Sequence, residues 1–410
     1  MIARLSGSGG GNHQTGAHHE APHRRPGSRV RRSHTAGRLA KRLHRDDVEI
    51  TLVNGDPEFV ERIRMHQLAS GQELRPRPLR DLFAGTGVQV RIAQVTAVDV
   101  ERKTVDLGGE TLSYDTLVYA LGSVIADQGV PGAEEHAYNA AGKQAALRLR
   151  ARLSEVKPGG AVLIVGGGLT GIETATEIAE ARPDLEVAIA ARGRVGGWLS
   201  DKAQRHLRGA FDQLGITVHD DVDITRVEAD GVVTGAGRIE AQVTVWTGGF
   251  TVHPIAAATT LEVSDTGRIV VDAGMRSVSH PDVYAVGDAA FAEGAGGKPL
   301  RMSCASANPM AWLAAAVIAA RLTGRKVPET TIGYVLQCIS IGRCDGIVQR
   351  VTPDDQVMPT AFTGRTAARI KEMICASAAW GISHPTMMRP SRRRRLAVTG
   401  AAETRTLIRS

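Results

Sequence analysis

Long hydrophobic runs are absent from this 410-residue sequence. In its second half, the longest stretch free of charges and strong helix breakers, 311–320, is much shorter than the roughly 20 apolar residues of a spanning helix. The N-terminus places Arg4 ahead of a Gly-, Asn-, Gln- and His-rich segment, where a secretory signal would have an apolar core. We therefore expect neither a transmembrane nor a secreted protein, and we predict a cytoplasmic location.

Cysteine is also scarce, and its spacing excludes several classes of site. The four cysteines form no C-x-x-C pair and show no zinc-finger spacing; they are Cys304, Cys338, Cys344 and Cys375. The segment His19 to His23 matches H-E-x-x-H, but Pro22 prevents the helix that would bring both histidines to one face. No G-x-S-x-G or Walker loop is present. We therefore predict reduced thiols and no catalytic metal site.

The excess of positive charge is confined to the two ends of the chain. The formal net charge is +7, of which residues 1–45 carry +9 and residues 389–410 carry +6, so the body between them carries −8. A basic protein usually suggests a nucleic acid or an anionic membrane as partner. Because this body is acidic, we predict no nucleic-acid partner, while the basic tail from Arg392 to Arg395 is compatible with peripheral contact with the inner face of a membrane.

Apolar strands alternate with helical stretches from Val48 onward, which favours an α/β architecture with a largely parallel sheet. The pattern predicts strands at 48–53, 117–120, 161–165, 187–190, 243–246, 269–271 and 283–286. It predicts helices at 169–181, 201–214 and 311–322. Residues 1–28 show almost no apolar periodicity and are predicted to be disordered.

The clearest motif is a glycine-rich turn after the strand at 161–165. Gly166, Gly168 and Gly171 form G-x-G-x-x-G between an apolar strand and a helical pattern, which is the context of a dinucleotide-binding fingerprint. Gly166 permits the tight turn, Gly168 admits the pyrophosphate to the backbone, and Gly171 allows close packing of helix and strand. The sequence therefore predicts a nicotinamide dinucleotide site here.

The residue that contacts the ribose is expected about 20 residues further on, where the next strand ends at Arg192. No carboxylate stands there to bind the 2′-hydroxyl of NAD. Arg192 faces the 2′-phosphate of NADP in one interpretation and is an ordinary solvent-facing arginine in the other. The choice between NADH and NADPH stays open.

In three further segments, a predicted strand is followed by a glycine: 114–123 with Gly122, 245–250 with Gly248, and 282–289 with Gly287 and Asp288. In this order and spacing, they and the fingerprint resemble the flavoprotein oxidoreductases with two dinucleotide-binding domains, and most of all the type II NADH:quinone dehydrogenase-like branch. The resemblance covers about residues 39–380.

The resemblance implies roles for individual residues. Gly122 and Gly248 lie at the crossovers between an FAD domain and an inserted NAD(P)H domain. Asp288, after Gly287, binds the ribityl chain of FAD, and Glu173 lies near the nicotinamide, although a glutamate in the first turn of a helix is also favourable on its own. Residues 301–322 lie beside the flavin ring. Gly37, Asn54 and Arg64 fall on the flavin side of the pattern.

Two Rossmann-like domains and a small C-terminal region follow from this resemblance. The expected division is 1–28 as a basic His-rich tail, 29–122 as the first half of the FAD domain, 123–251 as the NAD(P)H domain, 252–330 as the second half of the FAD domain, 331–388 as a C-terminal interface region and 389–410 as a basic tail.

The sequence departs from the family pattern where the FAD domain should begin. The segment that matches its phosphate loop keeps only the third glycine, Gly37, while Arg32 and His34 stand on the first two glycine positions. Side chains there collide with the turn or the pyrophosphate, so weakened FAD binding is expected. The C-x4-C redox disulfide of glutathione-reductase-like relatives is also missing before residue 100.

The function expected is an FAD-dependent NAD(P)H oxidoreductase that passes hydride to flavin and electrons to a quinone-like or other small-molecule acceptor. In such an enzyme the cofactors carry the chemistry, so no side-chain nucleophile or metal is required, and the catalytic residues stay unknown. The alternative from another class is a catalytically impaired nucleotide-binding or regulatory protein. The acceptor and the oligomeric state do not follow from the sequence.

Overall fold

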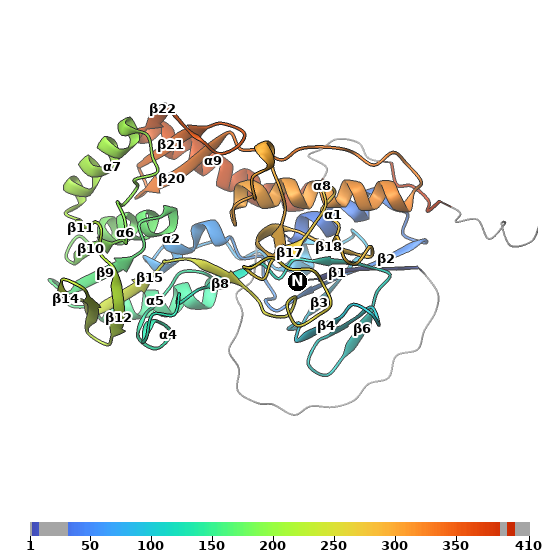
Figure 1. The fold of residues 1–410 in the computed structure, drawn as a ribbon, viewed down its shortest axis with the longest axis horizontal. Coiled ribbons are helices and arrows are strands. Elements are labelled where there is room, and N and C mark those ends of the chain that lie inside the picture. The colour runs from blue at the N-terminus through green and yellow to red at the C-terminus, as the bar shows by residue number, and fades with distance from the viewer. Residues whose placement is uncertain (1, 8–31, 386–391, 398–410) are drawn as a thin grey trace, which may run out of the picture.

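A computed structural model describes residues 2–7, 32–385 and 392–397 (Figure 1). The strands are β1 (Ile2–Gly7), β2 (Val48–Asn54), β3 (Val88–Ile92), β4 (Ala97–Asp99), β5 (Thr104–Asp106), β6 (Thr111–Ser113), β7 (Thr116–Tyr119), β8 (Ser123–Ile125), β9 (Ala161–Val165), β10 (Glu186–Ala190), β11 (Thr217–His219), β12 (Ile224–Glu228), β13 (Gly231–Thr234), β14 (Gly237–Glu240), β15 (Val243–Trp246), β16 (Phe250–Val252), β17 (Ile269–Val270), β18 (Val283–Ala285), β19 (Ala290–Phe291), β20 (Leu336–Ile341), β21 (Asp345–Val351) and β22 (Val357–Thr363). The α-helices are α1 (Arg32–Arg42), α2 (Met65–Ala69), α3 (Leu79–Leu82), α4 (Ala133–His136), α5 (Lys143–Glu155), α6 (Leu169–Ala181), α7 (Asp201–Leu214), α8 (Cys304–Leu322) and α9 (Gly364–Ser383).

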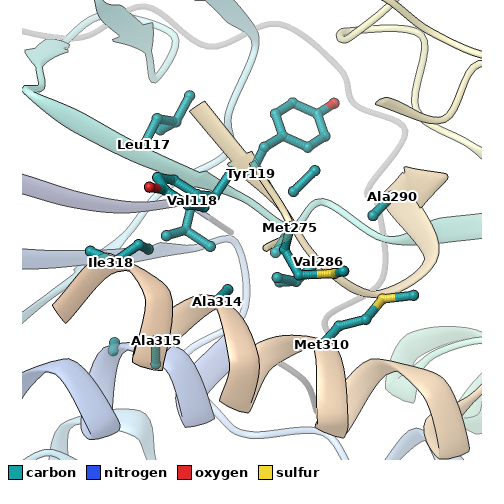
Figure 2. Close-up of a cluster of buried hydrophobic side chains, with 14 of the residues drawn as sticks. Leu117, Val118, Tyr119, Met275, Val286, Ala290, Met310, Ala314, Ala315 and Ile318 are labelled. Carbon is teal, nitrogen blue, oxygen red and sulfur yellow. The ribbon is translucent and has the colours of Figure 1, made fainter. Parts of the chain in front are cut away.

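The first sheet has five strands in the order β18-β7-β1-β2-β3. Helices α1 and α8 lie side by side over one face of it (Figure 1). Figure 2 shows how Val118 of β7 and Val286 after β18 meet Ala314 and Ile318 of α8 in the buried core. The small residues on this side of α8 allow the helix to approach the sheet closely.

Strand β1 contradicts the prediction that residues 1–28 are disordered, because residues 2–7 occupy the centre of this sheet. The strand runs antiparallel to both neighbours, with Gly7 opposite Val48 and Ile2 opposite Val53 and Tyr119. Residues 8–28 lie outside the described part. The segment predicted to form a degenerate phosphate loop is helical instead, because α1 begins at Arg32 and includes residues 32–37.

The second sheet is parallel throughout, in the order β11-β10-β9-β15. Both of its faces are covered, as a run of apolar residues predicts. Val162 and Ile164 of β9 pack with α5, α6 and α7, whereas Leu163 and Val165 pack with the β12-β13-β14 meander. Successive side chains of β9 point to opposite faces of the sheet, so this strand contributes to two hydrophobic cores.

A short antiparallel pair lies between the sheets, in which Ile125 of β8 is opposite Phe250 of β16. The third layer is the β20-β21-β22 sheet with α9, which packs against α6 and α7. Residues 392–397 of the predicted basic tail lie against the C-terminal end of α1 and the turn before β2, where Arg394 forms a bridge with Leu43 and Arg395 pairs with Asp46 and Asp47. The side chains of Arg394 and Arg395 stay exposed there. Within the described ranges, no helix has the length and apolarity to cross a membrane.

The strands and helices predicted from Val48 onward are confirmed, with α6 and α7 at their predicted bounds. Helix α8 begins earlier than predicted, at Cys304. Ser303 caps it by accepting a hydrogen bond from the backbone N–H of Ser306, and Pro309 falls inside the helix. The apolar pattern detects only the part of α8 after this proline.

Candidate active site

The glycine-rich turn between β9 and α6 has the geometry that a dinucleotide needs. Gly166 has φ of +122°, in the left-handed half of backbone space that glycine tolerates. A Cβ atom on Gly171 would lie 1.8 Å from the carbonyl oxygen of Gly166, so helix and strand approach each other as the motif predicts. A Cβ on Gly168 would meet nothing within 4 Å. The turn therefore presents open space directly at the N-terminus of α6.

A cavity of about 750 Å³ extends from this turn along the carboxyl ends of β9 and β10. Arg192 lines it, and its Nη2 donates to Oε1 of Gln128 at 2.7 Å. The Gln128 amide in turn donates to the carbonyl oxygen of Gly248. Arg192 and Gly248 thus lie on one wall, joined by a residue that sequence reasoning missed. Gln128 has positive φ and follows no motif.

A second cavity, of about 590 Å³, lies where α6, α8, α9 and the β8/β16 pair meet. Gly168, Trp246 and Thr247 line both cavities, so one turn borders the two spaces. Much of the remaining lining is apolar, including Leu336 and Ile374. This wall suits a flat, partly apolar ring system.

Asp288 lies in the second cavity, 3% exposed, directly after Gly287 with φ of +73°. Its Oδ2 accepts a hydrogen bond from Oγ of Ser123 at 2.7 Å and lies 3.5 Å from Nη1 of Arg62. Arg62 also stacks over the ring of Phe250 at 4.6 Å. Gly122, with φ of +70°, immediately precedes Ser123 and turns the chain into β8.

Arg62, not the predicted Arg64, lines this cavity. Arg64 points away and pairs with Glu372 and Glu61. The two arginines are two residues apart in a short 3-10 helix, Arg62–Arg64, so their side chains project from different sides of this helix. Sequence alone gave no signal to choose between them.

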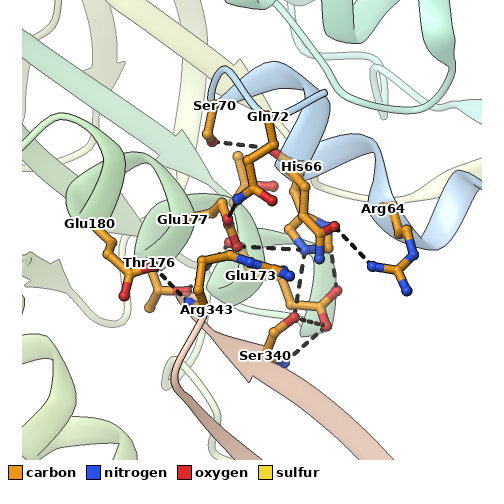
Figure 3. A network of polar contacts seen from close by, with 12 residues as sticks. Arg64, His66, Ser70, Gln72, Glu173, Thr176, Glu177, Glu180, Ser340 and Arg343 are labelled. Carbon is orange, nitrogen blue, oxygen red and sulfur yellow. Dashed lines mark hydrogen bonds and ion pairs between the residues drawn. The ribbon is translucent and has the colours of Figure 1, made fainter. Parts of the chain in front are cut away.

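Glu173, in the second turn of α6, lines the second cavity, and Figure 3 shows its carboxylate beside Ser340. Its Oε1 accepts hydrogen bonds from Nζ of Lys371 at 2.7 Å and from both the backbone N–H and Oγ of Ser340 at 3.0 Å. Burial opposes ionisation, but Lys371 and then His66 outweigh it and hold the pKa of Glu173 below its ordinary value. Burial likewise opposes charge on Lys371, yet Glu173 raises the pKa of that ammonium group above its usual range. The pair is therefore ionised.

Like Arg64, two further predicted flavin-side residues line neither cavity. Gly37 lies in α1, where a Cβ would be 3.3 Å from Cβ of Pro385 and 3.6 Å from the ring of Phe83. Asn54 ends β2, and its side-chain amide donates to the carbonyl oxygen of Asp56. Their roles toward FAD stay predictions.

The residues present fit the two cofactors that the family resemblance implies. On the nicotinamide side, the open space at Gly168 and the N-terminus of α6 fit a pyrophosphate. On the flavin side, Oδ1 of Asn308 and Oε1 of Gln337 are buried at the second cavity and have no hydrogen-bond partner within the described residues. These two side-chain oxygens fit a ring system whose edges carry polar groups. No strand-turn-helix phosphate loop precedes α1 in the described ranges, which lack residues 8–31.

Among the described residues, no group of three or more His, Cys, Asp or Glu side chains is arranged to hold a metal ion. All four cysteines are free thiols. Cys304, Cys338 and Cys375 line the second cavity, and burial raises the pKa of Cys338 and of Cys375 to about 11.

Residues 34–317 match the sequence profile of the pyridine nucleotide-disulphide oxidoreductases. The chain belongs to this family. Among curated relatives, the NADH dehydrogenase-like protein YutJ of Bacillus subtilis is 26% identical over 73% of this chain and 84% of that protein. The demethylphylloquinone reductase NdbB of Synechocystis is 27% identical over 73% and 78%.

Solved structures support the same fold. The sulfide:quinone oxidoreductase of Aquifex aeolicus superposes with a TM-score of 0.71 at 18% identity, over 88% of this chain and 91% of that one. NDH2 of Plasmodium falciparum, in complex with NADH, gives 0.70 at 14% identity over 87% and 96%. Membership makes this chain an NAD(P)H dehydrogenase-like flavoprotein oxidoreductase with FAD and NAD(P)H as cofactors, as predicted. The alternative of a regulatory nucleotide-binding protein is not favoured.

Proposed function

We propose that the chain oxidises NAD(P)H and passes the electrons through FAD to a quinone-like acceptor. The observation that carries this proposal is the position of Gly168, which borders both cavities. A dinucleotide with its pyrophosphate at this turn has the adenosine end toward Arg192 and the nicotinamide end toward Glu173. When bound, FAD accepts hydride from the nicotinamide and gives electrons to the acceptor.

The proposed domain division follows the chain through the β8/β16 pair. Residues 123–251 form the NAD(P)H domain, inserted between the two halves of an FAD domain at 29–122 and 252–330. Strand β1 suggests that residues 2–7 belong to that FAD domain as well. The region 331–388 supplies one wall of the second cavity through Gln337 and Lys371.

The chain's own residues position the two cofactors. Asp288, held by Ser123 and Arg62, is the acceptor proposed for ribityl hydroxyl groups. The N-terminus of α8, at Cys304, directs backbone N–H groups at the space beside it. Trp246 and Phe250 help to exclude water from the junction of the cavities, where hydride transfer needs a dry site.

A quinone is the acceptor class that the second cavity suits best. Its wall from the C-terminal region combines apolar Leu336, Ile374 and Ala378 with the ionised pair of Glu173 and Lys371. A flat ring contacts the apolar side, while the ammonium and carboxylate groups lie near its carbonyl oxygens. The relative NdbB, named as a demethylphylloquinone reductase, supports this choice.

We also propose that the C-terminal layer contacts a membrane peripherally. The C-terminal layer leaves large apolar side chains exposed, with Met373 at 64%, Phe362 at 48% and Trp380 at 41%. Arg365 and Arg369, also on α9, are exposed and suit anionic headgroups. Replacing Met373 and Trp380 by serine is expected to reduce co-sedimentation with anionic vesicles and to leave oxidation of NADPH by a water-soluble quinone unchanged.

The proposed function is tested with the full chain reconstituted with FAD. Anaerobic addition of NADPH or NADH should bleach the flavin absorbance, and a short-chain quinone should restore it. The Asp288→Ala variant should retain much less FAD after gel filtration, because the cavity loses its acceptor for the ribityl chain. Failure of both nucleotides to bleach bound flavin would overturn the proposal, and flavin retention unchanged in Asp288→Ala would remove Asp288 from the site.

A further inference from the structure

Three glutamates of α6 lie at spacings of four and three residues, which places them along one side of the helix. Glu173 is 7% exposed and borders the second cavity, Glu177 is 1% exposed, and Glu180 is exposed. The row therefore leads from the cavity to solvent. A row of acids is by itself a common helix surface, so the argument rests on what surrounds its buried member.

Glu177 has an oxygen that the fold leaves without a hydrogen bond. The amide of Gln72 donates to Oε1, whereas Oε2 has no hydrogen-bond partner within the described residues. A buried carboxylate oxygen in this state is costly unless the group carries a proton. Burial raises the pKa of Glu177 to about 7, with Arg343 opposing and Glu180 and Glu173 adding to the rise.

His66 of α2 stands between the two buried glutamates (Figure 3). Its Nδ1 lies 3.9 Å from Oε2 of Glu173, and its Nε2 lies 4.0 Å from Oε2 of Glu177. The imidazole is 5% exposed, and burial lowers the pKa of His66 to about 4, although Glu173 acts in the opposite direction. A neutral imidazole has one donor nitrogen and one acceptor nitrogen, so it can receive a proton on one side and release one on the other.

We propose that Glu177 and His66 form a relay that carries protons from solvent at the outer end of α6 to Glu173 at the acceptor cavity. This inference rests on the proposed function. Both gaps are about 1 Å longer than a hydrogen bond, so each transfer needs a rotation of the ring or of a carboxyl group. Glu177 and His66 act through Glu173 and are positioning residues.

Reduction of a quinone by NAD(P)H requires a supply of protons at the acceptor cavity. Oxidation of NAD(P)H by a quinone breaks one C–H bond, transfers two electrons as hydride and forms two O–H bonds, so it takes one proton from water for each quinol formed. The walls around the acceptor cavity are largely apolar, and its Glu173 is held ionised by Lys371. A proton that reaches Glu173 does not rest there, because the reduced acceptor oxygen is the stronger base.

The charged and titratable groups that face the relay come from every element packed on it. Glu173 and Glu180 belong to α6, Lys371 to α9 and Arg343 to the turn after β20, and Arg64 precedes α2. The cations disfavour a positive charge on His66. They leave the protonated carboxyl of Glu177 as the donor at neutral pH.

The test separates the two half-reactions of the FAD-reconstituted full chain. In Glu177→Gln, the side chain keeps its shape and its oxygen still accepts from Gln72, but it cannot exchange a carboxyl proton. Bleaching of flavin by NADPH should stay within about twofold of the wild type, and reoxidation by a short-chain quinone at pH 6 should slow about tenfold or more. The wild-type reoxidation rate should fall as pH rises through about 7, and the variant should lose this dependence.

The control is Thr176→Val, a neighbouring buried side chain on α6 that hydrogen-bonds only to its own helix. It should leave both half-reactions unchanged. Equal slowing of both half-reactions in Glu177→Gln, or unchanged reoxidation with its pH dependence intact, overturns the relay. Absence of flavin bleaching in the wild type overturns the proposed function instead, and the relay with it. Should the variant not fold, infrared titration of the wild type decides: a buried carboxyl band that titrates near pH 7 is expected, and its absence rejects the relay.

Discussion

Nζ of Lys371 lies 2.7 Å from Oε1 of Glu173, although 198 residues separate them along the chain. The pair joins α9 of the C-terminal layer to the second turn of α6, and both side chains are largely buried. Its geometry makes the C-terminal region part of the candidate active site. A buried ion pair costs solvation energy but becomes far more costly when one partner is removed.

Replacing Lys371 by methionine should therefore destabilise the protein by about 3 kcal/mol at pH 7, because the Glu173 carboxylate loses its main partner. Urea unfolding measures the change. Lys202→Met is the matched control, since Nζ of Lys202 donates only to the neutral carbonyl oxygen of Ala361. It should cost about 1 kcal/mol or less. Equal effects of the two substitutions would show that the ion pair contributes nothing specific.

Local patterns in the sequence predicted the strand, turn and helix at the proposed nicotinamide site well. The strand, turn and helix around Gly166 and Gly171 are built from contacts within about ten residues, so periodicity and glycine spacing suffice to describe them. The contacts of Lys371 and Ser340 with Glu173 are different. They depend on how a distant layer packs, and no spacing in the sequence encodes that.

The first sheet also depends on long-range contacts that local sequence patterns do not predict. Residues 2–7 carry no clear strand signal in the sequence, and their place between β2 and β7 depends on pairing across more than 40 and more than 100 residues. Arg62 was missed in favour of Arg64 because the side of a single 3-10 turn that faces the cavity is set by tertiary packing.

Gly168 and Gly171 should differ in how substitution by alanine affects stability. At Gly171 the added Cβ collides with the backbone of Gly166, so the variant should lose stability and nucleotide binding together. At Gly168 nothing lies within 4 Å of the added atom, so thermal stability should be unchanged while NADPH affinity falls. Thermal unfolding and equilibrium titration together check both. A Gly168→Ala variant with normal affinity would place the pyrophosphate elsewhere.

Arg192→Glu should shift the preference of the enzyme toward NADH. The new carboxylate repels a 2′-phosphate and accepts a hydrogen bond from a 2′-hydroxyl, so the ratio of kcat/KM for NADPH to that for NADH should fall at least about tenfold. Arg226→Glu is the control, because Arg226 is exposed in the same domain and does not line the nucleotide cavity. If the ratio is the same in wild type and Arg192→Glu, Arg192 is the solvent-facing residue of the other interpretation.

Strand β1 predicts that residues 2–7 contribute to the stability of the fold. Arg4 pairs with Thr51 on one side and Leu117 on the other, so Arg4→Pro removes a backbone donor from the centre of the sheet. The melting temperature should fall, by an amount equivalent to about 1 kcal/mol or more. Arg4→Ala keeps the backbone donor and should have little effect. A proline variant as stable as the alanine variant would remove residues 2–7 from the sheet.

The pH dependence of stability should reveal Glu177 and His66 as opposing groups. The folded pKa of Glu177, about 7, is above its ordinary value of 4.5, so its contribution to stability is fully present below pH 4.5 and is lost as pH rises through 7. The folded pKa of His66, about 4, is below its ordinary value of 6.5, so its contribution is present above pH 6.5 and is lost as pH falls through 4. Each slope is roughly 1.4 kcal/mol per pH unit, and the two nearly cancel between pH 4.5 and 6.5.

Removing one group should therefore expose the slope of the other. Urea unfolding of Glu177→Gln should show stability that rises with pH from 4.5 to 6.5 more steeply than in the wild type. His66→Phe should show the reverse, a decline toward pH 7 that the wild type lacks. Because all other titrating groups are common to the three proteins, the differences between their profiles isolate these two. Profiles that are parallel across the whole range would mean that neither pKa is shifted in the folded state, because a group whose pKa is the same folded and unfolded adds no slope.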